Sequence, residues 1–216
     1  MQRKLIFSIG EYYHLYNRGV EKRNIFLKEK DWIRFHKLLY LANSINPIRF
    51  REVDNQILNS VERGDPLVAI GAYVLMPNHF HILVKEVVEN GISRFMEKLT
   101  TGYSMYFNKK YERVGPLFQG RFKGEHVNAN EYLKYLYAYI HLNPVKLIEP
   151  DWKEAGIKNQ KYALEYVGEY YYSSYKDYCG VTREESVILS KDKFPLYFSK
   201  NHDFQTYIND WLAFNN

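Results

Sequence analysis

The chain is 216 residues long, which is the size of one domain with room for an appendage and is enough to bury a hydrophobic core. Hydrophobic residues make up 46% of it and charged residues 25%, a composition that excludes a disordered chain. The formal net charge of +5 suits a polyanionic partner, and 21 Tyr and 13 Phe offer flat surfaces for stacking bases.

Cysteine content and apolar run length predict the compartment. The single cysteine, Cys179, excludes an internal disulfide, and no secretory signal follows the N-terminus. No apolar run approaches the roughly 20 residues that a membrane span needs. We therefore expect a cytoplasmic protein.

Hydrophobic periodicity and turn residues predict the following elements in chain order: a strand at 12–17, a helix at 31–43, an irregular connection at 44–65 with a short helix near 56–61, strands at 67–76 and 80–84, a helix from 91 to about 110, a strand at 117–127, and a helix ending at 143. This β-α-β-β-α-β-α order is typical of the ferredoxin-like split β-α-β domain. The predicted fold class is therefore α+β, with a four-stranded antiparallel sheet and helices on one face. Residues 1–146 are assigned to this domain and residues 147–216 to a C-terminal extension packed on it.

Two histidines flank a phenylalanine in the second hairpin strand. Because strand side chains alternate, His79 and His81 are predicted to share one face, with Phe80 on the other. Neutral imidazole is a common ligand of divalent metals, so this pair favours a metal site. Two histidines spaced in this way, with no further ligand, more often have a structural role than bind a metal.

The last predicted helix carries two further polar side chains. At roughly 100° per residue, Tyr139 and Asn143 lie one above the other, beside a buried stripe. Asn143 offers an amide oxygen to a cation, although an asparagine before proline is also an ordinary helix stop. Tyr139 is a candidate nucleophile on phosphorus, with Tyr135 and Tyr132 in reserve.

Basic residues follow the second long helix and the first strand. We expect a basic group near the sheet edge that contacts phosphate, although charges in loops are solvated more often than they bind. The candidate nucleic-acid-binding residues are Arg18, Lys109, Lys110, Arg113, Arg121 and Lys123, and Lys22 and Arg23 extend the same surface.

Three ordered motifs point to a family. The segments MPNHFHILV, GPLFQGRFK and YLYAYIHLNPVK resemble those of the IS200-like Y1 transposases, and the closest likeness is to the REP-associated tyrosine transposases. The resemblance covers roughly residues 12–146 and extends weakly to the segment YSSY at 172–175.

The resemblance implies both the reaction and the residues that perform it. His79, His81 and Asn143 would be the metal ligands, with Mg²⁺ or Mn²⁺ as the metal, and Tyr139 would be the catalytic residue of this HUH-type enzyme. The reaction would be metal-dependent cleavage and rejoining of single-stranded DNA near a hairpin, through a covalent 5′-phosphotyrosine. The substrate would be nucleoid DNA of a bacterial-type cell, and a monomer is favoured over a homodimer.

Two other functions fit the same residues. A transposase relative that binds structured single-stranded DNA or RNA without cutting it would use the same sheet and basic surface. A metal-dependent hydrolase of small phosphates would turn over without a covalent intermediate. The intact set of His79, His81, Tyr139 and Asn143 favours the enzyme.

Overall fold

The structure is a computed structural model, and it describes residues 6–47, 50–53 and 56–214. Its strands are β1 (Tyr12–Arg18), β2 (Val68–Met76), β3 (His79–Glu86) and β4 (Lys123–Val127). Its helices are α1 (Glu29–Leu41), α2 (Phe50–Val53), α3 (Gly91–Lys110), α4 (Asn130–Leu142), α5 (Trp152–Ala155), α6 (Gln160–Glu169), α7 (Tyr175–Tyr178) and α8 (Asn201–Phe214). The predicted element order up to α4 is confirmed. Within the irregular connection, the structure has α2 and a 3-10 turn at Leu58–Ser60.

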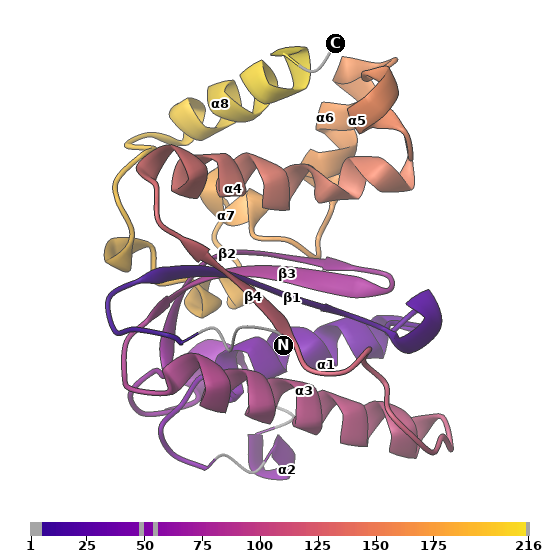
Figure 1. Cartoon of the computed structure of the whole chain (residues 1–216), viewed down its shortest axis with the longest axis vertical. Helices are drawn as coiled ribbons and strands as arrows, with labels where there is room; N and C mark the ends of the chain where they lie inside the picture. The colour runs from indigo at the N-terminus through magenta and orange to yellow at the C-terminus, as the bar shows by residue number, and fades with distance from the viewer. Residues whose placement is uncertain (1–5, 48–49, 54–55, 215–216) are drawn as a thin grey trace.

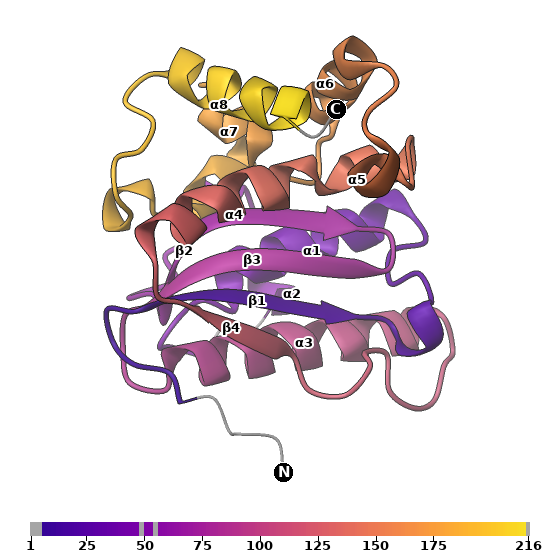
Figure 2. The ribbon, with the colours of Figure 1, turned by 45° about the horizontal axis from the view of Figure 1, so that its top comes forward.

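The strands form one antiparallel sheet in the order β2-β3-β1-β4 (Figure 2). Its register sets Arg18 opposite His79 and Tyr16 opposite His81 on the neighbouring strands β1 and β3. Residues that oppose each other in an antiparallel pair project from the same face of the sheet. One face therefore carries both histidines beside a cationic and an aromatic side chain.

Helices cover both faces of this sheet, and the prediction of helices on one face is wrong. Figure 1 shows α1 and α3 on one side and α4 on the other, with α5, α6 and α8 beyond α4. The physical reason lies in β2, all nine residues of which are buried. A strand that is apolar at consecutive positions must be covered on both sides, so one layer of helices does not suffice.

The fourth strand is also shorter than predicted. It begins at Lys123, whereas the pattern predicted a start at Leu117. Gly120 has a φ of +71°, and its amide bonds back to the carbonyl of Phe118. This turn interrupts the extended path, although Leu117 and Phe118 are both buried as core residues.

The segment 170–175 attaches the C-terminal part of the chain to the free edge of β2. The amide of Leu75 donates to the carbonyl of Tyr172, and the amide of Tyr73 donates to Oγ of Ser174 at 3.0 Å. Oγ of Ser174 also lies 2.7 Å from Nε2 of His141 on α4. The YSSY segment thus has a structural role, in which it fixes α4 against the sheet. Among the described helices, none combines the length and the apolar character that a membrane span requires.

Candidate active site

The hairpin of β2 and β3 positions the two histidines as the alternation of strand side chains predicts. The ring centroids of His79 and His81 are 5.1 Å apart, whereas Phe80 packs against Phe35 and Phe118 on the opposite face. His81 is buried and His79 is half-buried. The strand therefore brings the two imidazoles together on one face of the sheet.

Each imidazole already has one ring nitrogen occupied. Nδ1 of His79 donates to Oδ1 of Asn78 at 2.6 Å, and Nδ1 of His81 lies 2.9 Å from Nε2 of His14. Burial, reinforced by Lys146, lowers the pKa of His79 to about 4. Burial also holds the pKa of His81 well below its usual value, with His14 as a further cause. Both rings are therefore neutral at pH 7, which is the state in which imidazole binds a metal.

Helix α4 brings Tyr139 and Asn143 to the histidines. The ring centroid of Tyr139 lies 5.5 Å from that of His81. Nδ2 of Asn143 donates to the carbonyl of Tyr139 at 2.8 Å, and a side-chain hydrogen bond joins Asn143 to His79. The stripe expected from the helical period lies on the buried side of α4, at Leu133, Leu136, Tyr137 and Ile140. The structure thus brings together all four residues of the predicted catalytic set.

The donor set at this point fits a divalent cation. Two neutral imidazole nitrogens and one amide oxygen are the donors that would hold a metal, and the contacts of each Nδ1 leave Nε2 as the ring nitrogen that would bind it. No group of three or more His, Cys, Asp or Glu side chains suited to a metal occurs in the described part of the chain. Three protein ligands of which one is an amide leave coordination positions for water or substrate.

Comparison with known proteins agrees with these motifs. Residues 55–143 match the family model described as "Transposase IS200 like". The family resemblance is confirmed over that segment. No curated protein sequence matches the chain at a significant level.

A solved structure described as "Structure of the REP associates tyrosine transposase bound to a REP hairpin" is similar, with a TM-score of 0.53 at 13% sequence identity. The similarity covers 92% of this chain and 95% of that one. At this identity the likeness shows the fold alone. The α+β class with a four-stranded antiparallel sheet is therefore confirmed, and it is the fold of a tyrosine transposase.

The neighbours of Tyr139 shift the pKa of its phenol in both directions. Burial raises the pKa of its phenol, and Tyr135 and Glu125 raise it further, whereas the hydrogen bond from Asn143 lowers it. Nζ of Lys153 lies 4.3 Å from the centroid of the Tyr139 ring. This places the ammonium group over the face of the ring, as in a cation–π contact. Lys153 is thus a functional candidate that the sequence motifs did not include.

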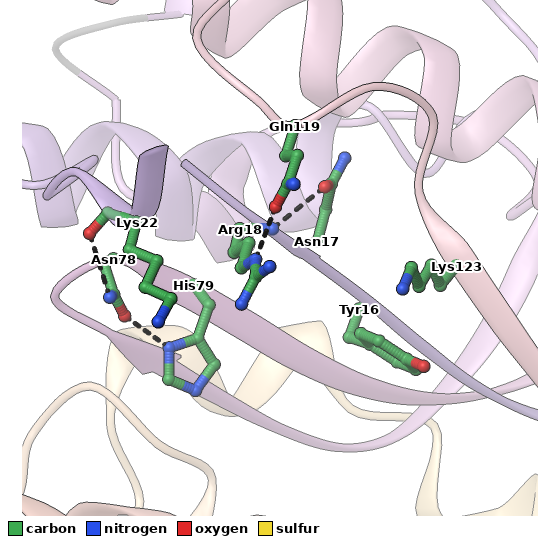
Figure 3. Close-up of a pocket in the computed structure, with 8 residues that line it drawn as sticks. All are labelled: Tyr16, Asn17, Arg18, Lys22, Asn78, His79, Gln119 and Lys123. Atoms are coloured by element: carbon green, nitrogen blue, oxygen red, sulfur yellow. Dashed lines mark hydrogen bonds between the residues drawn. The ribbon is translucent and has the colours of Figure 1, made fainter. Parts of the chain in front are cut away.

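A cationic hollow adjoins His79 (Figure 3). Its volume is about 460 Å³, and it is lined by Tyr16, Asn17, Arg18, Lys22, Asn78, His79, Gln119 and Lys123. Nε of Arg18 donates to Oε1 of Gln119 at 2.5 Å, which fixes the guanidinium on the wall. Two of the predicted phosphate contacts, Arg18 and Lys123, therefore lie beside the histidines.

The other predicted basic residues lie elsewhere. Nζ of Lys110 forms an ion pair of 2.5 Å with the fully buried Asp31, and Arg113 donates to Asn108. Lys109 is exposed near the end of α3, and Arg121 lines a separate hollow against α3. The single basic group expected from the sequence is thus divided between the two sides of the sheet, and a phosphate contact by these four residues stays a prediction.

Proposed function

We propose that this protein cleaves and rejoins single-stranded DNA, with Tyr139 as the nucleophile and His79, His81 and Asn143 as metal ligands. The observation that carries the proposal is that α4 brings two side chains to the histidines. The ring centroid of Tyr139 lies 5.5 Å from that of His81, and Asn143 forms a side-chain hydrogen bond with His79. The match of residues 55–143 to IS200-like transposases supports the same reaction class.

In this reaction, the Tyr139 oxygen attacks the scissile phosphorus as a phenolate. A bond forms between that oxygen and phosphorus, the bond from phosphorus to the 3′ oxygen breaks, and the leaving 3′ oxygen takes up a proton. The products are a 5′-phosphotyrosine and a free 3′-OH, and rejoining is the reverse attack. Mg²⁺ or Mn²⁺, when bound, stabilises the negative charge that develops on the phosphate.

The chain's own residues prepare Tyr139 for this attack. Its pKa is raised by burial, so the neutral phenol prevails unless positive charge lies close by. Lys153 places its ammonium group over the face of the ring, 4.3 Å from the centroid. Nδ2 of Asn143 donates to the Tyr139 carbonyl, so the amide oxygen, which lies toward His79, is the atom of this side chain that would bind a cation.

The substrate strand is proposed to cross the cationic hollow beside His79. Arg18, Lys22 and Lys123 line it and would bind the phosphates that flank the cleavage point. The similar tyrosine transposase structure is described as bound to a REP hairpin, which supports hairpin-flanked DNA as the substrate here.

A monomer is the proposed active form. The histidines on β3 and the tyrosine on α4 come together within one chain, as the ring separation of 5.5 Å between His81 and Tyr139 indicates. An enzyme that required the tyrosine helix of a second subunit would not need this arrangement.

The proposal is tested with a labelled pool of single-stranded hairpin oligonucleotides, incubated with Mn²⁺ or with chelator and separated by denaturing electrophoresis. We expect a covalent protein-DNA adduct with Mn²⁺ alone. The adduct should be absent in Tyr139→Phe and His79→Ala and should still form in Tyr135→Phe. Binding of the pool without any adduct would contradict the catalytic proposal and favour a non-catalytic binding module.

A further inference from the structure

A second hollow lies beside Tyr139, toward the C-terminal helices. Its volume is about 200 Å³, and it is lined by Tyr135, Ala138, Tyr139, Leu142, Trp152, Lys153 and Trp211. Three of these residues come from outside the matched segment 55–143. The C-terminal part of the chain therefore adds walls to the neighbourhood of the proposed nucleophile.

Aromatic rings form one wall of this hollow, and they are held in place. The ring centroids of Tyr135 and Trp211 are 4.9 Å apart, and Tyr135 is 5.9 Å from Tyr139. Trp211 hydrogen bonds to the hydroxyl of Tyr207, which in turn donates to the carbonyl of Lys134 on α4 at 3.0 Å. Helix α8 is thus fixed to α4 with an indole beside the hollow.

Lys153 and Trp152 complete the lining, and Lys153 brings a cation to it. Nζ of Lys153 lies between two rings, 4.3 Å from that of Tyr139 and 5.6 Å from that of Trp152. Trp152 is 5% exposed, and its Nε1 has no hydrogen-bond acceptor within the described part of the chain. This nitrogen is itself inaccessible to solvent, so it does not face the hollow as a donor.

We propose that this hollow binds one nucleotide of the DNA strand, the one that stays attached to Tyr139 through its 5′-phosphate. The inference rests on the proposed function. A nucleotide combines a flat base with an anionic phosphate, and the hollow offers aromatic rings and Lys153. An apolar ligand would leave the cation unmatched.

The position of the hollow selects which nucleotide it holds. Tyr139 lines it, and Lys153 contacts the Tyr139 ring. After cleavage, the nucleotide on the 3′ side of the break is tied to this tyrosine, so its base stays within reach of Trp211. The nucleotides on the 5′ side are left to the cationic hollow beside His79. The two hollows would hold the two strand ends in place for rejoining.

The test measures how much bases add to binding, in the presence of chelator so that no cleavage occurs. The dissociation constants of an oligodeoxythymidine and of an abasic oligomer of equal length are compared for each protein. We expect Trp211→Leu to reduce the preference for the base-bearing oligomer by about tenfold, the usual loss when one stacking ring is removed. Trp211→Phe keeps a ring and should restore most of the preference.

A matched control is Tyr162→Ala, which removes a 50% exposed aromatic side chain from α6. It should leave the preference unchanged. Lys153→Met should weaken the binding of both oligomers alike, because it removes a charge that meets phosphate. Thermal unfolding of each variant identifies any loss of fold.

Two results are decisive. A preference that stays unchanged in folded Trp211→Leu would overturn the nucleotide site. Because no metal is present, the measurement is independent of strand cleavage. A protein that forms no adduct with Mn²⁺ but loses its base preference in Trp211→Leu would refute the proposed reaction and retain the nucleotide site.

Discussion

Nε2 of His14 lies 2.9 Å from Nδ1 of His81, and Nδ1 of His14 faces Oε2 of Glu125 at 3.9 Å. A carboxylate beside Nδ1 favours the proton on that nitrogen of His14, so Nε2 of His14 accepts the proton of His81. His81 then presents Nε2 as its free nitrogen. This is the arrangement in which a second histidine orients a metal ligand.

We expect His14→Phe to weaken Mn²⁺ binding by about tenfold, because the ring of His81 loses the partner that fixes its orientation. Isothermal titration calorimetry measures the affinity directly. His126→Phe is the matched control, since His126 is exposed and pairs with Glu11 away from the site. Equal Mn²⁺ affinity in His14→Phe and in the wild type would contradict the orienting role.

We expect some of the basic residues to bind DNA and others to stabilise the fold. Lys123→Met and Arg18→Met should each weaken binding of single-stranded DNA and reduce the slope of log affinity against log salt by about 0.7, the value for one phosphate contact. Both residues line the hollow beside His79. Fluorescence anisotropy over a salt series provides the slope.

Lys110→Met is the contrasting variant. It should leave the salt slope unchanged and lower the free energy of unfolding by about 2 kcal/mol, because the fully buried Asp31 loses its ion-pair partner. Urea unfolding measures this loss. A changed slope with unchanged stability would show that Lys110 binds phosphate instead.

Stability should fall in mild acid because of His36 on α1. Nδ1 of this buried side chain lies 3.9 Å from Oε1 of Glu185, and neither ring nitrogen has a hydrogen-bond partner among the described residues. Burial, with Arg183 as a further cause, outweighs this carboxylate and lowers the pKa of His36 to about 3. The unfolded chain takes up a proton near pH 6.5, whereas the folded chain does not until about pH 3. The contribution of His36 to the free energy of unfolding is therefore complete above pH 6.5 and is lost as the pH falls toward 3.

Between pH 7 and pH 4 this loss should be on the order of 3 kcal/mol, and His36→Phe should remove it. The aromatic neighbours Tyr73 and Tyr172 suit a phenylalanine ring. Urea unfolding across this pH range measures the effect, with His202→Phe as a control at an exposed position. An unchanged pH profile in His36→Phe would rule out this histidine as the cause.

Local periodicity was sufficient to predict how the proposed catalytic residues pair within each element, and the family resemblance joined the two pairs. Alternation along one strand placed His79 and His81 together, and the helical period placed Tyr139 above Asn143. The continuous burial of β2 also had a signal in the sequence, since Val68–Met76 is apolar at nearly every position, and that signal favours helices on both faces.

The remaining site residues had no such signal. His14 reaches His81 only through the register of β1 and β3, and Lys153 and Trp211 reach Tyr139 only through the attachment of the C-terminal helices to α4. These contacts join residues that are distant in the chain. Neither strand alternation nor helical period predicts contacts of that kind.

The most direct test of the central claim is to identify which tyrosine carries the DNA. Adduct formed with Mn²⁺ on a hairpin oligonucleotide is digested with nuclease and protease, and the nucleotide-bearing peptide is sequenced by mass spectrometry. A 5′-phosphonucleotide on Tyr139 is the predicted result. The same group on Tyr132 or Tyr135, or on no tyrosine at all, would contradict the account.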